Sequence, residues 1–371
     1  MKKKKSWKTP AIQTANLFAE DTIHAVLESI AQGKHPGMKK PDVLYEALDE
    51  QLNKIENVKN AETQLKLLAL LLGTDAVLKT LDDDDYDDFL ELYTDTSAFF
   101  IELAKEFEDK KTVMDLIFDL IMNHSGEDGR SAVFLSLSEM FDEKQNLGFL
   151  QSLFQVFESG KTPENSHSIL EAIRDVADGL NIPEEYARAS FMQNPERSNH
   201  MLLDVANAYF TSGNLSETKR LLDEVKNPDP EDEREFLDLS AGYYYKTGNV
   251  ARAIELAERL YERYPELFNL ARLTQIVPAP RRKELLDNYE NRMLPENDDA
   301  VLPYIDLLIS VEDFERLSQI LDRYAQTLTI FPAEILNEYS ERLENCGKTE
   351  LARKIRDWTV EEPEEVETDE E

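Results

Sequence analysis

The chain has 371 residues, of which 41 are Lys or Arg and 76 are Asp or Glu, so its formal net charge is −35. This charge argues against general binding to nucleic acid and to anionic membrane surfaces, because both depend on Lys and Arg facing phosphate groups. Hydrophobic residues make up 41% of the chain, which is enough for a folded core, whereas only 12 residues are Gly. Sheet proteins and nucleotide-binding proteins usually need more glycine for their turns and phosphate loops.

The ends of the chain and its cysteine content bear on localisation. Residues 1–10 are basic but are not followed by an apolar core, so we expect a flexible N-terminus rather than a secretory signal. Residues 359–371 consist mostly of Glu and Asp and are expected to form a disordered acidic tail. The longest apolar run, Leu67–Leu72, is much shorter than the roughly 20 residues that span a bilayer. Since Cys346 is the only cysteine, no internal disulfide can form, and we predict a cytoplasmic protein without a membrane span.

Apolar residues recur at helical spacing throughout residues 11–195. The expected helices are 14–31, 43–58, 63–81, 85–107, 111–122, 129–141, 147–158 and 166–180. No stretch alternates apolar and polar residues in the way of a half-buried strand, and the connections between the helices are short. The N-terminal half is therefore predicted to be an irregular helical region built from helix hairpins.

An internal repeat with an offset of 35 residues follows in the second half. Its first copy is Leu202-x-x-Val205-Ala206-x-x-Tyr209-x-x-x-Gly213-Asn214-Leu215, and its second is Leu237-x-x-Ser240-Ala241-x-x-Tyr244-x-x-x-Gly248-Asn249-Val250. We expect the two alanines to be buried where the helices of each hairpin meet. The two glycines can end the first helix in a left-handed conformation. In the second helix Ala253 is small, whereas Thr218 departs from this pattern.

Two weaker copies come later, with Glu312 and Gly347 at the turn position, again 35 residues apart. Between the clear and the weaker copies, residues 266–293 are expected to form an atypical hairpin that bends at Pro278-Ala279-Pro280. Residues 196–358 are therefore predicted to be a repeat region. We expect its boundary with residues 11–195 to lie near Gln193-Asn194-Pro195-Glu196.

These landmarks resemble the tetratricopeptide-repeat superfamily, whose unit has about 34 residues, and the resemblance is clearest over residues 197–265. It implies an all-α protein, a right-handed solenoid of helix hairpins in which neighbouring hairpins bury each other's apolar faces. It also implies that the first helices line a groove that holds a peptide. The implied groove positions are His200, Leu203, Asn207, Phe210, Thr211, Glu235, Asp238, Gly242, Tyr245 and Lys246.

Family members that clamp a terminal carboxylate place Lys or Asn at several of these positions, and in this chain only Asn207 matches. Leu203 and Asp238 stand where a Lys would be expected, so the groove is acidic and partly aromatic. The predicted partner-binding residues are Asn207, Phe210, Glu235, Asp238, Tyr245 and Lys246. Their composition suits a basic or amphipathic protein or peptide segment, and no cofactor is expected.

Candidate catalytic and metal-binding residues lack the partners that their chemistry needs. The run Asp82–Asp88 has no Gly at the sixth and no Glu at the twelfth position of a calcium loop, so we interpret it as the acid-rich first turn of a helix. His24 and Glu28 lack a second pair of ligands, and no nucleophile motif surrounds His124-Ser125 or Cys346. We therefore expect neither a metal site nor a catalytic site.

The sequence thus predicts a non-catalytic protein-interaction module or scaffold. One alternative is a peptide- or ligand-responsive regulator with a helical effector domain in residues 11–195. A second alternative is an enzyme whose site is assembled from residues that are distant in the sequence. A third is acidic mimicry of nucleic acid, which the net charge would permit.

Overall fold

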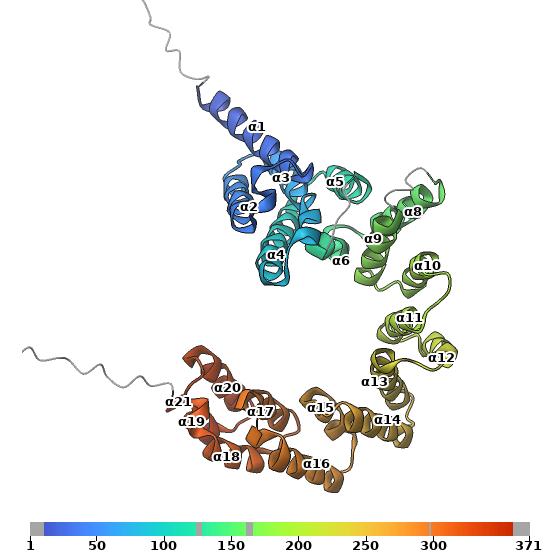
Figure 1. Cartoon of the computed structure of the whole chain (residues 1–371), viewed down its shortest axis with the longest axis vertical. Helices are drawn as coiled ribbons and strands as arrows, with labels where there is room; N and C mark the ends of the chain where they lie inside the picture. The colour runs from blue at the N-terminus through green and yellow to red at the C-terminus, as the bar shows by residue number, and fades with distance from the viewer. Residues whose placement is uncertain (1–10, 124–127, 161–165, 297, 359–371) are drawn as a thin grey trace, which may run out of the picture. The chain divides into compact units, whose positions relative to one another are not determined.

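The computed structural model describes residues 11–123, 128–160, 166–296 and 298–358. Within these ranges all regular structure is helical and no strand is present, which confirms the prediction of an all-α protein (Figure 1). The basic segment 1–10, the acidic segment 359–371 and the pair His124-Ser125 lie outside the described residues. The chain divides into two compact units, Met1–Lys226 and Asn227–Glu371.

The division between the units falls between the two clear copies of the repeat. It therefore differs from the boundary expected near Gln193-Asn194-Pro195-Glu196. Helix α11 (Asn199–Thr211) belongs with the helices before it, because Asp204 on α11 forms an ion pair with Arg174 on α9 (Ser166–Gly179).

Helices of the first unit mostly match the predicted ranges, with breaks that the periodicity did not reveal. Apart from α9 and α11, the unit contains α1 (Ala11–Ala31), η1 (Pro36–Lys39), α2 (Pro41–Glu56), α3 (Ala61–Leu72), η2 (Asp75–Thr80), α4 (Asp83–Glu106), α5 (Lys110–Asn123), η3 (Asp128–Arg130), α6 (Ser131–Leu135), α7 (Leu137–Met140), α8 (Glu143–Glu158), α10 (Pro183–Gln193) and α12 (Leu215–Glu224). The expected helix 63–81 ends at Gly73 and resumes as a 3-10 helix, and the expected helix 129–141 is interrupted at Ser136. Helix α10 was not predicted as a separate element.

A buried polar cluster joins η2, η3 and α4 in the first unit. Arg130 is 4% exposed, and its Nε lies 3.5 Å from an oxygen of the fully buried Asp75. The Arg130 Nη1 also donates a 2.7 Å hydrogen bond to the carbonyl oxygen of Leu120. Beside this pair, the hydroxyls of Thr74 and Tyr93 are 2.8 Å apart, and burial raises the pKa of Tyr93. Polar side chains from separate segments are thus part of the core.

The second unit consists of helix hairpins. Its elements are α13 (Pro230–Lys246), α14 (Val250–Arg263), α15 (Leu267–Ile276), α16 (Ala279–Arg292), η5 (Leu294–Glu296), η6 (Asp298–Ala300), α17 (Val301–Ser310), α18 (Phe314–Arg323), α19 (Ala325–Leu328), α20 (Ala333–Asn345) and α21 (Thr349–Arg356). The atypical hairpin expected at 266–293 is confirmed as α15 and α16, with the bend at Val277 and Pro278.

The turn position of the repeat is left-handed in all four predicted copies. The φ angles are 84° at Gly213, 82° at Gly248, 58° at Glu312 and 72° at Gly347. The next residue in each copy donates its backbone N–H to the carbonyl five residues earlier. These bonds run from Asn214 to Tyr209, from Asn249 to Tyr244, from Asp313 to Leu308 and from Lys348 to Leu343. Such bonds satisfy carbonyls that the end of a helix leaves open, so one hairpin geometry recurs in both units.

Burial follows the same register. Ala206 is 0% and Ala241 is 8% exposed, which confirms their predicted burial. In the second helix of each hairpin, Thr218, Ala253, Leu317 and Ala352 are fully buried. The Thr218 hydroxyl donates a 3.0 Å hydrogen bond to the Asn214 carbonyl oxygen. A buried hydroxyl is tolerated when it is hydrogen-bonded, so this departure from the pattern does not disturb the hairpin.

Candidate protein-interaction surface

The six predicted partner-binding residues fall on two helices. Asn207 is exposed and Phe210 half-buried on α11 of the first unit. The other four lie on α13 of the second unit. There Glu235 and Asp238 are half-buried, and Tyr245 and Lys246 are exposed. Of the six, Asp238 and Tyr245 line one pocket together.

One expectation about the groove is wrong. Leu203 was expected to face an open surface, but its side chain is 0% exposed. Leu202, Leu203 and Val205 on α11 are all buried, so this helix is covered on more than one side. Helical spacing shows that these residues are apolar, whereas their burial depends on the helices packed around α11.

The pocket that Asp238 and Tyr245 line has a volume of about 200 Å³ and is formed by α13, α14 and α15. Its apolar surface comes from Ala241, Ala257, Leu260 and Ile276, and its polar rim from Asp238, Asn269, Arg272 and Gln275. Binding sites for whole small molecules usually measure about 300–1,000 Å³. This pocket therefore suits a single side chain of a larger partner better than a small-molecule ligand.

The charges at the pocket are paired across two helices. Asp238 of α13 forms an ion pair with Arg272 of α15, and Arg234 of α13 forms another with Glu266. The Arg272 guanidinium also lies 5.3 Å from the ring centroid of Phe268. Asp238 is consequently held by its own protein, and so is Glu233 of α13, which forms ion pairs with Arg259 and Arg263.

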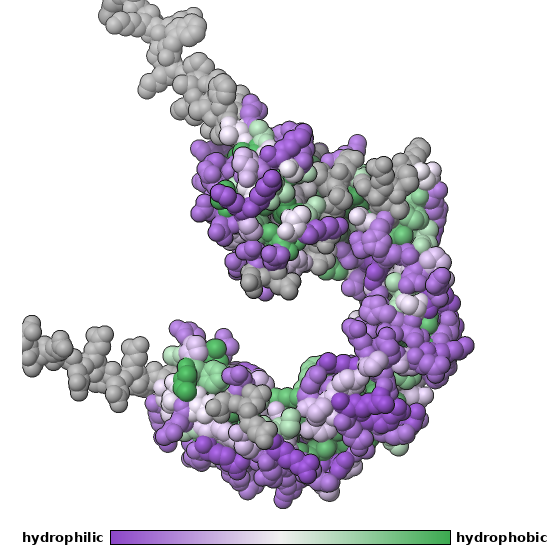
Figure 2. Space-filling view, viewed as in Figure 1, coloured by the Kyte–Doolittle hydropathy of each residue, from purple (hydrophilic) through white to green (hydrophobic). Residues whose placement is uncertain are grey.

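Two aromatic side chains extend from this pair of helices into solvent. Tyr245 is 52% exposed and Phe268 is 62% exposed. Phe268 was missed, because it lies in the atypical hairpin, where the 35-residue offset cannot be counted. Figure 2 shows that hydrophilic residues cover most of the visible surface of both units. Among the large exposed hydrophobic side chains of the described residues, Tyr245 and Phe268 are the aromatic ones.

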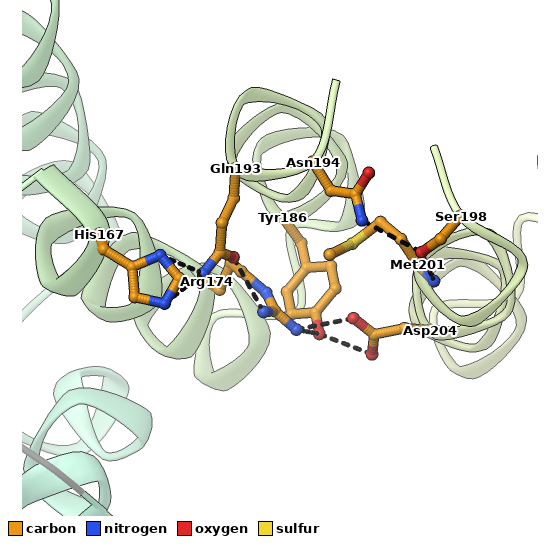
Figure 3. Close-up of polar contacts among 8 residues, drawn as sticks. All are labelled: His167, Arg174, Tyr186, Gln193, Asn194, Ser198, Met201 and Asp204. Atoms are coloured by element: carbon orange, nitrogen blue, oxygen red, sulfur yellow. Dashed lines mark hydrogen bonds and ion pairs between the residues drawn. The ribbon is translucent and has the colours of Figure 1, made fainter. Parts of the chain in front are cut away.

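A second polar cluster joins α9, α10 and α11 in the first unit (Figure 3). The Arg174 Nη2 donates to Asp204 at 2.6 Å and to the Tyr186 hydroxyl at 2.8 Å, and this hydroxyl donates to the other Asp204 oxygen at 2.8 Å. The Arg174 Nη1 donates to Gln193 at 3.2 Å. Burial raises the pKa of Tyr186 to about 12. Because Arg174, Asp204 and Tyr186 bond to one another from three helices, the cluster is a cross-link between helices rather than an open site.

The remaining candidates lie where the sequence suggested. Asp82 is the residue before α4, which confirms that the acidic run forms the start of a helix. His24 and Glu28 are 3.8 Å apart on α1, and Cys346 is exposed at the end of α20. Among the described residues, no group of three or more His, Cys, Asp or Glu side chains could hold a metal ion. In the same part of the chain, no helix is long and apolar enough to cross a membrane.

The chain was compared with models of known protein families and with curated proteins, and neither comparison finds a match.

Proposed function

We propose that this chain is a cytoplasmic protein-interaction module with a tetratricopeptide-like solenoid architecture, and that it acts without a cofactor. The observation that carries the proposal is the pocket between α13 and α15, which the exposed Tyr245 lines, together with the exposed Phe268 on α15. The partner would be a basic, amphipathic segment of another protein. One of its apolar side chains would enter the pocket, and its basic residues would face the carboxylates of α13.

Ion pairs between consecutive hairpins support the solenoid. First helices are linked by Arg174 and Asp204, by Asp238 and Arg272, and by Asp306 and Arg342. Second helices are linked by Glu258 and Arg281, by Asp287 and Arg316, and by Asp322 and Lys354. Within each unit, the first helix of a hairpin thus contacts the first helix of a neighbouring hairpin, and in the second unit the second helices do the same. Solenoids stack their repeats in this way.

Charge complementarity supports a basic partner. Helix α13 begins with Glu231, Asp232 and Glu233, and Glu235 lies one turn before Asp238. Of these, Glu233 already forms ion pairs with Arg259 and Arg263. The net charge of −35 adds a long-range attraction for cationic segments and raises their association rate. The apolar floor and the exposed aromatics supply contacts that slow dissociation, because buried anchors mostly determine how long a partner stays bound.

The test is a binding titration of the full chain with a fluorescein-labelled peptide. The peptide is designed to form a helix, with Leu and Phe at positions i, i+3 and i+4 and Lys at all other positions. It is called the Lys peptide below. We expect Tyr245→Ala and Phe268→Ala each to weaken binding about tenfold, which corresponds to about 1.4 kcal/mol. Ile330→Ala is the control, because Ile330 is 82% exposed in the same unit but lies on neither α13 nor α15.

The salt dependence separates the two contributions. Raising the salt concentration from 0.1 M to 1 M shortens the Debye length from about 10 Å to about 3 Å, so association should slow while dissociation changes little. An association rate that does not change with the salt concentration would contradict the electrostatic part of the proposal. Equal losses in Ile330→Ala and Phe268→Ala would show that the peptide binds elsewhere.

A further inference from the structure

A groove of about 540 Å³ lies between α5 and α8 in the first unit, on helices that the proposed function does not use. Its floor is apolar and is formed by Met114, Phe118 and Phe149. Phe118 and Phe149 contact each other edge to face, with ring centroids 6.2 Å apart. Phe149 is buried, whereas Met114 and Phe118 are only half-buried. The groove thus exposes apolar surface over a length greater than one side chain.

The rim of this groove is basic, although the protein as a whole is acidic. Lys110, Lys111 and Lys144 line it together with one acidic residue, Asp115. Lys110 donates to the carbonyl oxygens of Ala104 and Lys105 and so helps to end α4. The two nearby carboxylates at the starts of the helices are occupied as caps. Asp109 accepts from Thr112, and Asp142 accepts from Gln145.

Lys111 and Lys144 are exposed, and no ion pair joins either of them to an acidic side chain in the part of the chain that the structure describes. Three other lysines of the same unit, Lys54, Lys66 and Lys105, each form an ion pair with a glutamate. The groove therefore carries two exposed lysines outside ion pairs, and the charge of Lys111 interacts with the exposed carboxylate of Asp109.

A glycine inside α8 points to an occupant. Gly148 lines the groove, and no atom beyond its own stretch of helix lies within 4 Å of the position that a Cβ would take. A glycine in the middle of a helix lowers its stability relative to alanine, and close approach of another group to the backbone is one reason for it. Gly179 at the end of α9 has one, because its Cβ would lie 2.1 Å from the Leu135 carbonyl oxygen. At Gly148 the chain supplies no such reason, and the open space permits a partner to approach the backbone closely.

We propose that the groove between α5 and α8 is a docking site for an acidic, amphipathic segment of a partner protein. Apolar side chains of the segment pack over Gly148 and against Met114 and Phe118. Its carboxylates face Lys111 and Lys144. The chain then has two docking surfaces with opposite preferences, since α13 and α15 suit a basic segment.

The test uses the full chain and a fluorescein-labelled Glu peptide, which has Leu and Phe at the same helical positions as the Lys peptide and Glu at the others. The variant K111E/K144E should weaken its binding about tenfold, since charge-assisted contacts are lost and repulsion is added. The matched control is K39E/K40E, which changes the net charge equally at two exposed lysines of the same unit that do not line the groove. The control should retain wild-type affinity apart from a small, salt-dependent loss.

The floor of the groove is tested separately. Gly148→Leu has room to fold, because nothing lies within 4 Å of the Cβ position, and its side chain would occupy the groove. We expect it to weaken binding of the Glu peptide about tenfold even at 1 M salt, where charge effects are screened. Gly148→Ala is the control, because it removes the same helix penalty but fills little of the groove. Circular dichroism melting of both variants shows whether they fold.

Several outcomes would overturn this proposal. These are a Glu peptide that does not bind, equal losses in K111E/K144E and K39E/K40E, wild-type binding by Gly148→Leu, and a Lys peptide that competes for the same groove. Because Tyr245 and Phe268 lie on other helices, replacing either with Ala should leave binding of the Glu peptide unchanged. Failure of one docking site is thus distinguishable from failure of the other.

Discussion

In the first unit, Asp75 and Arg130 are 0% and 4% exposed and come from two different 3-10 helices. In the second unit, the ion pair between consecutive hairpins formed by Asp306 and Arg342 leaves both side chains more than 40% exposed. Among the described residues, Asp75 and Arg130 are the pair that is buried this deeply, whereas partly exposed pairs also join consecutive hairpins of the second unit through Asp238 and Arg272 and through Asp322 and Lys354. The first unit thus contains a fully buried ion pair, whereas pairs between hairpins of the second unit range from Arg316 and Glu290, at 11% and 12% exposed, to Asp306 and Arg342 at the surface.

This difference has an energetic consequence. Removing one partner of a buried ion pair leaves an uncompensated charge in a low-dielectric core, whereas an exposed pair contributes about 0–1 kcal/mol. In stacked repeats each hairpin contacts mainly its neighbours, so a substitution acts locally. A substitution in the core of the first unit should instead affect many elements at once.

The largest expected effect is at Arg130. Arg130→Met removes the cation beside Asp75 and the hydrogen bond to Leu120, so the free energy of unfolding of the first unit should fall by about 3–5 kcal/mol. Urea denaturation followed by circular dichroism measures this loss. Asp75→Asn/Arg130→Met, which removes both charges, should recover part of the stability. A loss below about 1 kcal/mol in the single variant would erase the contrast with the exposed pairs.

An intermediate effect is expected inside the hairpins. Ala241→Leu would overpack the contact between α13 and α14 and lower the free energy of unfolding by about 1–3 kcal/mol, and Ala206→Leu should do the same in the other unit. The control is Ala251→Leu, at an exposed position of α14. Hydrogen exchange should show that faster exchange in Ala241→Leu is confined to the hairpin and its neighbours. Loss of protection throughout the second unit would contradict local behaviour.

The smallest effect concerns alkaline pH. Burial raises the pKa of Tyr186 to about 12, above its usual value of 10, so the folded state holds this proton more tightly than the unfolded state. The resulting stabilisation is fully present below pH 10 and is lost as the pH rises toward 12. Tyr186→Phe should therefore remove part of the alkaline loss of stability, which denaturation at pH 8 and at pH 11 would measure. If the free energy of unfolding of Tyr186→Phe changes with pH as in the wild type, Tyr186 is not held by Arg174 and Asp204 as drawn in Figure 3.

Local features of the chain were predictable from its sequence. The repeated turn at Gly213 and Gly248, and its weaker copies at Glu312 and Gly347, appear at the predicted positions with left-handed backbone. The helices, the burial of Ala206 and Ala241, and the bend at Pro278 follow in the same way. Each depends on hydrogen bonds or contacts within one hairpin, so a stretch of about 35 residues contains all the information needed.

Only the tertiary structure decided how distant segments meet. It buried Leu203, paired Asp75 with Arg130, paired Asp238 with Arg272, and left Gly148 beside a groove. None of these depends on a residue's own helix alone, because a helix stripe shows which residues are apolar and not which neighbour covers them. The candidate surfaces were therefore only partly predictable. The sequence determined the hairpins and the charge of the protein, and packing between hairpins determined where apolar and charged side chains remain open to a partner.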